Sequence, residues 1–253
     1  LVHWLGRDHW QWIVGAWAVL PLINVVQFIF CKLPPVVPEA ERQGARVLLR
    51  CKFFYMIVLT IALGGMTEVS IAMWTSAFLE RAMELPKLLG DIAGMCLFGA
   101  MLGTGRLCYG LFGKKIDVLN VMMIGAAASI VLYLIVALSG NWMLVLAACA
   151  LCGLTVSLLW PGSVSLGAAE FPLAGTWLFA MLAAGGDIGA SIGPYLVSLL
   201  ADNATTLPVL GDIAARSALS AEQFGLRCGM LLAAVFPLGT LLCLWWIRRN
   251  RKM

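Results

Sequence analysis

Long apolar runs separated by short polar segments dominate the hydrophobic pattern of the chain. Because about 20 helical residues cross the roughly 30 Å hydrocarbon core of a bilayer, such runs predict transmembrane helices. No run alternates apolar and polar positions with the period of two that strands show, so the pattern predicts an all-α membrane protein. Seven transmembrane helices are expected, at Trp10–Phe30, Phe53–Leu79, Gly90–Thr104, Val118–Leu138, Trp142–Leu166, Trp177–Leu200 and Phe224–Ile247.

The composition agrees with this pattern and excludes a soluble enzyme. Hydrophobic residues make up 62% of the chain and charged residues 12%, whereas soluble globular proteins have about 45–50% and about 25%. Such a chain cannot cover a surface that faces water, so we expect it to lie in the lipid bilayer. The formal net charge of +4 is too weak to indicate a nucleic-acid partner.

The cysteines and histidines do not indicate a redox or metal centre. Cys149 and Cys152 have the CxxC spacing, but they lie inside an apolar run with no histidine nearby. Thiols in such surroundings behave as small hydrophobic groups. His3 and His9 are not at metal-ligand spacing with any partner. We therefore expect no metal and no cofactor.

The basic residues are distributed unevenly between the two ends of the expected helices. Most of the 17 lysines and arginines lie in the segments 31–52, 105–117 and 248–253, which share one end. Cytoplasmic loops of membrane proteins are enriched in Lys and Arg, so the distribution places the N-terminus outside and the C-terminus in the cytoplasm. The expected location is the plasma membrane, which in a bacterium is the inner membrane, with the chain crossing it several times.

One segment resembles a signature that joins two helices on the cytoplasmic face of major facilitator superfamily transporters. It reads Gly-Arg-Leu-Cys-Tyr-Gly-Leu-Phe-Gly-Lys-Lys. The residues that match the signature are Gly105, Leu107, Gly113, Lys114 and Lys115. Tyr109 and Gly110 replace the Asp-Arg pair of the family, and the segment is one residue longer. The resemblance implies a cytoplasmic gate that contains the matching residues and Arg106.

Two further segments are similar to the C-terminal half of sugar-permease-like members of this superfamily. Gly64 to Trp74 resembles the first helix of that half, and Pro161 to Pro194 resembles the tenth and eleventh helices of the superfamily. The resemblance implies that residues 1–30 are the last helix of an N-terminal bundle and that residues 31–52 are a cytoplasmic linker between bundles. Residues 53–253 would form a C-terminal bundle of six helices in two inverted three-helix repeats. Since the chain begins with Leu1 rather than Met, we expect its partner to be a missing N-terminal transporter half.

These features lead to the hypothesis of a transporter rather than an enzyme. We expect secondary active transport of a small polar solute such as a sugar, by alternating access and coupled to an ion or proton gradient, as in a symporter. The alternative is a non-transporting seven-helix membrane module that binds a ligand or a partner. An intramembrane aspartyl protease is excluded because Asp187 has no second aspartate at membrane depth to share a proton with.

Glu68 is the strongest candidate for substrate binding or coupling. It lies near the middle of an apolar run, where an unpaired carboxylate costs several kcal/mol, so it should face a cavity or a partner. Thr67, Ser70 and Trp74 share one helical stripe beside it and predict a polar strip with an aromatic platform for a hydroxylated solute. A proton on Glu68 would couple transport to the proton gradient. The competing interpretation is a neutral carboxyl group that is hydrogen-bonded between helices.

Two other residues within apolar runs are candidates for the same site. Asp187 has glycine neighbours that leave room for a ligand, although a structural hydrogen bond to the next helix explains it equally well. Trp160 precedes Pro161, so we expect it either to line a cavity at a kink or to face lipid.

A third feature of the apolar runs is a stripe of small residues. Gly185, Gly189 and Gly193 lie on one face of the sixth expected helix, and Pro194 adjoins them. Small residues at this spacing allow two membrane helices to pack closely. The functional interpretation is a gate where two backbones approach each other, and the simpler one is ordinary helix packing.

Overall fold

The computed structural model describes residues 10–31, 38, 44–113 and 116–251. His3, His9, Lys114 and Lys115 lie outside the described residues. The chain divides into two compact units, Leu1–Glu39 and Ala40–Met253. The first unit contains one apolar helix, α2 (Trp10–Phe30), which has the predicted bounds. The division falls inside the predicted linker 31–52. The later part of this linker belongs to the second unit, because α3 (Ala45–Leu48) contacts α10 and Leu48 is buried.

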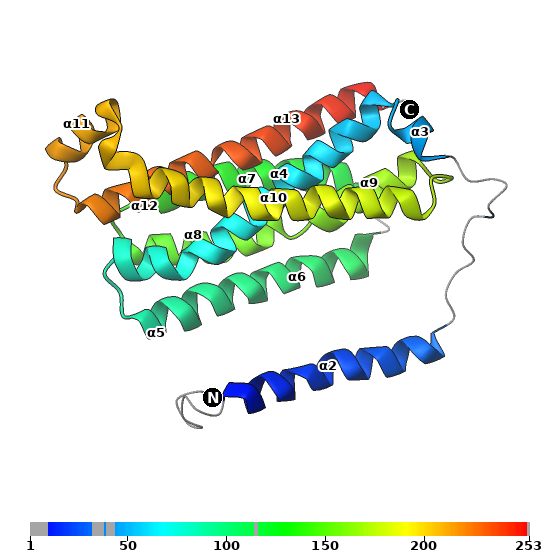
Figure 1. Ribbon diagram of the computed structural model, residues 1–253, viewed down its shortest axis with the longest axis horizontal. Coiled ribbons are helices and arrows are strands. Elements are labelled where there is room, and N and C mark those ends of the chain that lie inside the picture. Colours follow the sequence, from blue (N-terminus) through cyan, green and yellow to red (C-terminus); the bar gives the residue numbers. More distant parts are fainter. Residues whose placement is uncertain (1–9, 32–37, 39–43, 114–115, 252–253) are drawn as a thin grey trace. The chain divides into compact units, whose positions relative to one another are not determined.

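The second unit is a bundle whose long helices run roughly lengthwise, with α4 crossing obliquely (Figure 1). Its elements in chain order are α3 (Ala45–Leu48), α4 (Lys52–Ala77), η3 (Phe78–Ala82), α5 (Lys87–Leu89), η4 (Gly90–Met95), α6 (Cys96–Phe112), α7 (Val118–Leu138), α8 (Trp142–Val156), α9 (Leu159–Glu170), α10 (Thr176–Asn203), η6 (Ala204–Thr206), α11 (Pro208–Arg216), α12 (Ala221–Ala233) and α13 (Val235–Asn250). The described residues therefore form helices and the short segments that connect them, as the apolar pattern predicts.

Five helical stretches are long and apolar enough to cross a membrane. They are Lys52–Ala82, Lys87–Phe112, Val118–Leu138, Trp142–Glu170 and Ala221–Asn250. The chain thus has the character of a multi-pass membrane protein. The other two predicted spans are also helices, but α10 carries Asp187 and a run of glycines, and α2 contributes a shorter apolar stretch, Val14–Phe30.

Two of the five stretches are interrupted by local breaks that the sequence explains. The break between α8 and α9 falls at Ser157 and Leu158, one turn before Pro161. Proline has no backbone N–H and disturbs the helix over the preceding turn. The break between α12 and α13 falls at Ala234, three residues before Pro237. Each proline therefore bends a helix without ending its passage through the bundle.

The most extensive helix contact of the bundle joins α10 to α4. Gly185, Gly189 and Gly193 all face α4, and a Cβ atom at Gly193 would lie 2.7 Å from the Cα atom of Met66. Gly65 of α4 faces back, since a Cβ atom there would lie 2.7 Å from the carbonyl oxygen of Gly186. The two backbones can approach this closely only because neither carries side chains at these positions.

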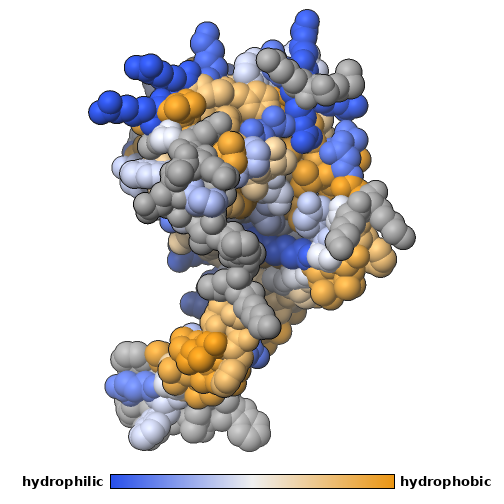
Figure 2. Space-filling model, turned by 90° about the vertical axis from the view of Figure 1, so that its right-hand side faces the viewer, coloured by the Kyte–Doolittle hydropathy of each residue, from blue (hydrophilic) through white to orange (hydrophobic). Residues whose placement is uncertain are grey.

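An aromatic cluster and an ion pair join the chain segments at one end of the bundle. The ring of Phe53 lies 5.9 Å from that of Trp246 and 6.5 Å from that of Phe171. Beside them, the Arg251 Nε atom lies 2.6 Å from the Glu170 carboxylate. Figure 2 looks onto this end and shows hydrophilic side chains gathered where α13 ends. The start of α4 and the ends of α9 and α13 are therefore held together here.

Candidate functional site

Opposite charges on α4 and α6 meet between these two helices. The Arg106 Nη2 atom lies 2.7 Å from the Glu68 Oε1 atom, and the two side chains are 44% and 13% exposed, respectively. The pairing depends on the length of α6, which continues to Phe112 and past the predicted end at Thr104. Arg106 is therefore a helical residue directed toward Glu68 rather than part of a connecting loop.

A backbone carbonyl group in the break between α8 and α9 fixes the other side of the guanidinium group. The Arg106 Nε atom donates a hydrogen bond of 3.2 Å to the carbonyl oxygen of Ser157. In an uninterrupted helix this oxygen would accept from the residue four positions later, which is Pro161 and has no N–H. The proline thus leaves an acceptor that Arg106 uses, and α4, α6 and the α8–α9 break meet at one side chain.

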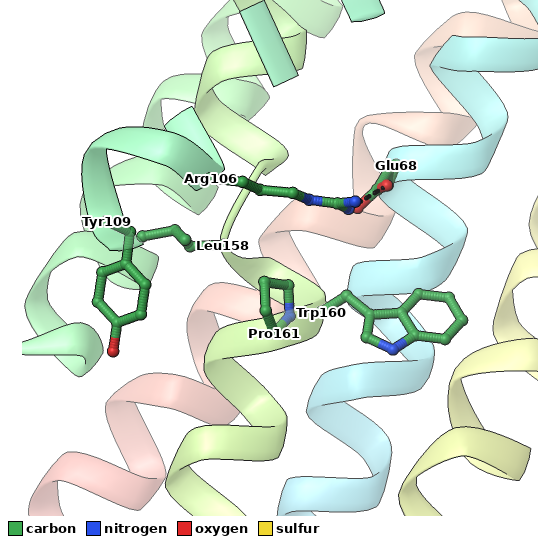
Figure 3. A pocket seen from close by; sticks show the side chains of 6 residues that line it. All are labelled: Glu68, Arg106, Tyr109, Leu158, Trp160 and Pro161. Carbon is green, nitrogen blue, oxygen red and sulfur yellow. Dashed lines mark hydrogen bonds and ion pairs between the residues drawn. The ribbon is translucent and has the colours of Figure 1, made fainter. Parts of the chain in front are cut away.

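The ion pair lines a cavity of about 440 Å³. The residues around the cavity are Glu68, Arg106, Tyr109, Leu158, Trp160 and Pro161, and Figure 3 shows Arg106 reaching across to Glu68 above Trp160 and Pro161. This volume lies within the range of about 300–1,000 Å³ that small-molecule sites occupy. The lining combines aromatic rings, apolar side chains and one charge of each sign, which suits a small polar molecule.

Gly186 of α10 makes room for the aromatic wall of the cavity. A Cβ atom at Gly186 would lie 2.9 Å from the Trp160 ring. The ring therefore rests against bare backbone, and its position depends on the absence of a side chain at residue 186. The glycine run of α10 accordingly serves both the α4 contact and the cavity wall.

Two buried polar atoms of α4 have no hydrogen-bond partner among the described residues. They are the second carboxylate oxygen of Glu68, Oε2, and the hydroxyl oxygen of Ser70. The neighbouring hydroxyl group of Thr67 is satisfied within its own helix, because it donates to the Leu63 carbonyl oxygen at 2.7 Å. Since Oε1 of Glu68 is held by Arg106, Oε2 is the oxygen that is left to accept a proton.

A buried tyrosine holds α4 next to Glu68. The Tyr133 hydroxyl group of α7 donates a hydrogen bond of 2.6 Å to the carbonyl oxygen of Thr67, and Tyr133 is fully buried. The bond fixes the backbone at the residue that precedes Glu68. The carboxylate is thus positioned from α7 as well as from α6.

We expect Tyr133→Phe to lower the stability of the bundle by about 1 kcal/mol, because the variant removes one buried hydrogen bond and keeps the ring. The change is measured as a fall in the midpoint of thermal unfolding in detergent. Tyr195→Phe is the matched control, since Tyr195 is 65% exposed on α10. Equal midpoints for the two variants would show that the hydroxyl contact does not stabilise α4.

The structure places the predicted site residues in four different surroundings. Glu68 and Trp160 line the cavity described above. Trp74 lines a different cavity of about 600 Å³ on α4 and α10, and its Nε1 atom donates to the Pro194 carbonyl oxygen at 3.3 Å. Asp187 lies on the exposed face of α10 and lines neither of these two cavities. The predicted polar strip is also divided, because Thr67 and Ser70 are fully buried and line neither cavity.

The residues of the predicted cytoplasmic gate are also divided. Gly105 packs against the Ser157 side chain, which allows α6 to approach the break between α8 and α9. Leu107 is 63% exposed and points away from the bundle. Gly113 follows the last residue of α6. Arg106 therefore belongs to the cavity, and Gly105 belongs to the contact between α6 and the break between α8 and α9.

Sequence reasoning missed Tyr109, Leu158 and Pro161 as lining residues and missed the contact between Glu68 and Arg106. Pro161 offered a signal, since a proline within an apolar run predicts a free carbonyl oxygen four residues earlier. Nothing in the local pattern connects that oxygen with Arg106, which lies 51 residues away. No group of three or more metal-ligating side chains is found among the residues that the structure describes.

Comparison with known proteins does not assign the chain to a class. No protein-family model matches the sequence. No curated protein matches it either. The functional argument therefore depends on the membrane character of the bundle and on the cavity around Glu68 and Arg106.

Proposed function

We propose that the chain is part of a secondary active transporter for a small polar solute, coupled to an ion or proton gradient. The observation that carries this proposal is the Glu68–Arg106 ion pair, which joins two helices at a cavity of the bundle. Glu68 lies near the middle of the apolar stretch Lys52–Ala82. Charged residues inside such stretches are costly and are characteristic of substrate and ion pathways.

The proposed architecture is that of the major facilitator superfamily. In it, α2 ends one bundle, and the helices from α4 to α13 supply the six crossings of the other, arranged as two inverted three-helix repeats. The end of the bundle with Arg251 faces the cytoplasm of a plasma membrane. Support comes from the basic residues Arg248, Arg249 and Arg251, which gather at one end of α13, because cytoplasmic segments are enriched in Lys and Arg.

In the proposed mechanism the ion pair is the coupling element. While Glu68 is ionised, it neutralises Arg106 and holds α6 against α4. A proton on Glu68 removes the attraction between the charges, so the guanidinium group becomes available to a solute in the cavity. Release of the proton from Glu68 restores the pair and expels the solute. The close, side-chain-free contact between α4 and α10 lets one helix slide along the other during this cycle.

Uptake by proteoliposomes that contain the complete protein tests the proposal. An imposed inward proton gradient should drive accumulation of a solute from a panel of sugars, sugar acids and amino acids, and an uncoupler should abolish it. Liposomes without protein provide the baseline. If no solute in such a panel accumulates or exchanges, the chain is instead a membrane module that binds a ligand or a partner without transporting it.

A further inference from the structure

We propose that the cavity takes a hydroxylated carboxylate of the sugar-acid class, and that this anion binds together with a proton on Glu68. The inference rests on the proposed function and concerns the substrate class of the same site. It follows from the charges that line the cavity, from the donors that Arg106 leaves free and from the position of the aromatic rings.

The charge balance of the cavity determines which solute fits each protonation state. Among its lining residues, Arg106 is the one cation and Glu68 the one carboxylate. With Glu68 ionised the lining is neutral, and an anionic solute would leave one negative charge without a partner in an environment of low dielectric constant. With a proton on Glu68, the anion replaces the carboxylate as the partner of Arg106. Anion and proton therefore bind together or not at all.

The guanidinium group has the free donors that such a solute requires. Arginine carries five N–H groups, of which Nη2 contacts Glu68 and Nε contacts the Ser157 carbonyl oxygen. The Nη1 donors have no partner among the described residues, and the Arg106 side chain is 44% exposed. When Glu68 is protonated, a carboxylate in the cavity can accept one hydrogen bond from Nη1 and one from Nη2, in the bidentate geometry that guanidinium and carboxylate groups prefer.

The remaining lining favours a hydroxylated ring or chain rather than an apolar one. Trp160 and Pro161 form one wall, and the Trp160 ring is held against Gly186. A flat aromatic surface suits the C–H face of a sugar, while Tyr109 adds a phenolic hydroxyl group that can donate or accept. A phosphate monoester carries nearly two negative charges at neutral pH, which one arginine cannot balance. The lining therefore favours a carboxylate over a sugar phosphate.

The groups around Glu68 define the expected pH dependence. Arg106 and Tyr109 of α6 line the same cavity, and Tyr133 of α7 contacts the neighbouring Thr67 carbonyl oxygen. The lining residues from α9 and the α8–α9 break, Leu158, Trp160 and Pro161, carry no charge, and Asp187 of α10 lies outside the cavity. Glu68 is thus the one lining carboxyl group whose protonation changes the charge opposite Arg106. Because linkage is reciprocal, lower pH should tighten binding of the anion and leave binding of a neutral sugar unchanged.

Isothermal titration calorimetry on the complete protein, with glucuronate, glucose and glucose 6-phosphate at pH 5.5 and pH 8, tests this inference. We expect glucuronate to bind at least about tenfold more tightly at the lower pH, which corresponds to about 1.4 kcal/mol. Glucose should bind weakly at both pH values, and glucose 6-phosphate more weakly than glucuronate. In Glu68→Gln, glucuronate should bind equally well at both pH values.

Variants at Arg106 provide the second arm. Arg106→Met should abolish glucuronate binding, and Arg106→Lys should weaken it because the charge stays while the forked geometry is lost. Arg81→Met is the control, since Arg81 pairs with Glu222 at an exposed position outside this cavity. Thermal unfolding verifies that each variant is folded, and Arg106→Lys carries the test if Arg106→Met is not.

The outcomes separate this inference from the proposed function. Binding of glucose that equals or exceeds that of glucuronate, or glucuronate binding that survives in the folded Arg106 variants, would overturn the inference. Gradient-driven uptake of a neutral solute alone would also overturn it, and would leave the transporter intact. If glucuronate binding depends on pH but proteoliposomes show no uptake, the ligand class is supported and the transport function is overturned.

Discussion

Glu68→Gln is expected to abolish gradient-driven accumulation while leaving solute exchange largely intact. The amide keeps the size of the side chain and still accepts a hydrogen bond from Arg106, but it cannot carry a proton. The solute can then bind and cross the membrane, yet no proton movement is linked to its own. Accumulation under an imposed proton gradient should fall to the level of liposomes without protein, and exchange of labelled for unlabelled solute should continue.

A carboxylate outside the cavity provides the control for this variant. Glu222 is 60% exposed and pairs with Arg81 at a distance of 3.2 Å. Glu222→Gln removes the same charge from the protein without touching the Glu68 site, so accumulation should stay at the wild-type level. If Glu68→Gln accumulates solute as well as Glu222→Gln does, Glu68 has no part in coupling.

Gly189→Leu is expected to disrupt the bundle, because residue 189 faces the backbone of α4. A Cβ atom there would overlap the Ala62 carbonyl oxygen, and backbone cannot move aside as a flexible side chain can. Inserting bulk into a well-packed interior costs about 1–3 kcal/mol in ordinary cases, and we expect a loss of about 3 kcal/mol or more here. The measurement is the yield of monodisperse protein and its unfolding midpoint in detergent.

Gly103→Leu is the matched control on α6. A Cβ atom at Gly103 would have no heavy atom within 4 Å, so a leucine there points away from the bundle and also improves helix propensity by about 1 kcal/mol. The two variants add the same side chain to glycines in helix interiors. Comparable loss of folded protein in both would show that the α4–α10 contact is not the reason for the glycine at position 189.

The sequence predicts helices in this protein well where their ends have a simple chemical cause. Val118–Leu138 agrees in both bounds with α7, and its start has such a cause, because the Asp117 side chain caps the first turn by accepting from the Leu119 N–H group. The end of α6 was predicted too early, since Arg106 interrupts the apolar run but does not stop the helix. A hydropathy pattern records the charge of Arg106 and cannot show that its partner lies on another helix.

The candidate site could be predicted only in part, for a geometric reason. A carboxylate in an apolar run predicts that Glu68 has a polar partner, and the partner exists. Its identity depends on the rotation and depth of α6 relative to α4, which packing over the whole bundle decides. Asp187 follows the same local rule as Glu68 and lies on an exposed face instead, so the local pattern does not distinguish these two acids.

The carbonyl oxygen that Pro161 leaves free gives the α8–α9 break a mechanical role. Arg106 binds this oxygen with its Nε atom and Glu68 with its Nη2 atom. The planar guanidinium group therefore connects the break between α8 and α9 to the Glu68 carboxylate on α4. A guanidinium group that turned away from Glu68 would therefore also have to shift or break its hydrogen bond to the Ser157 carbonyl oxygen. The bending of one helix and the charge state of another are thereby linked through a single side chain.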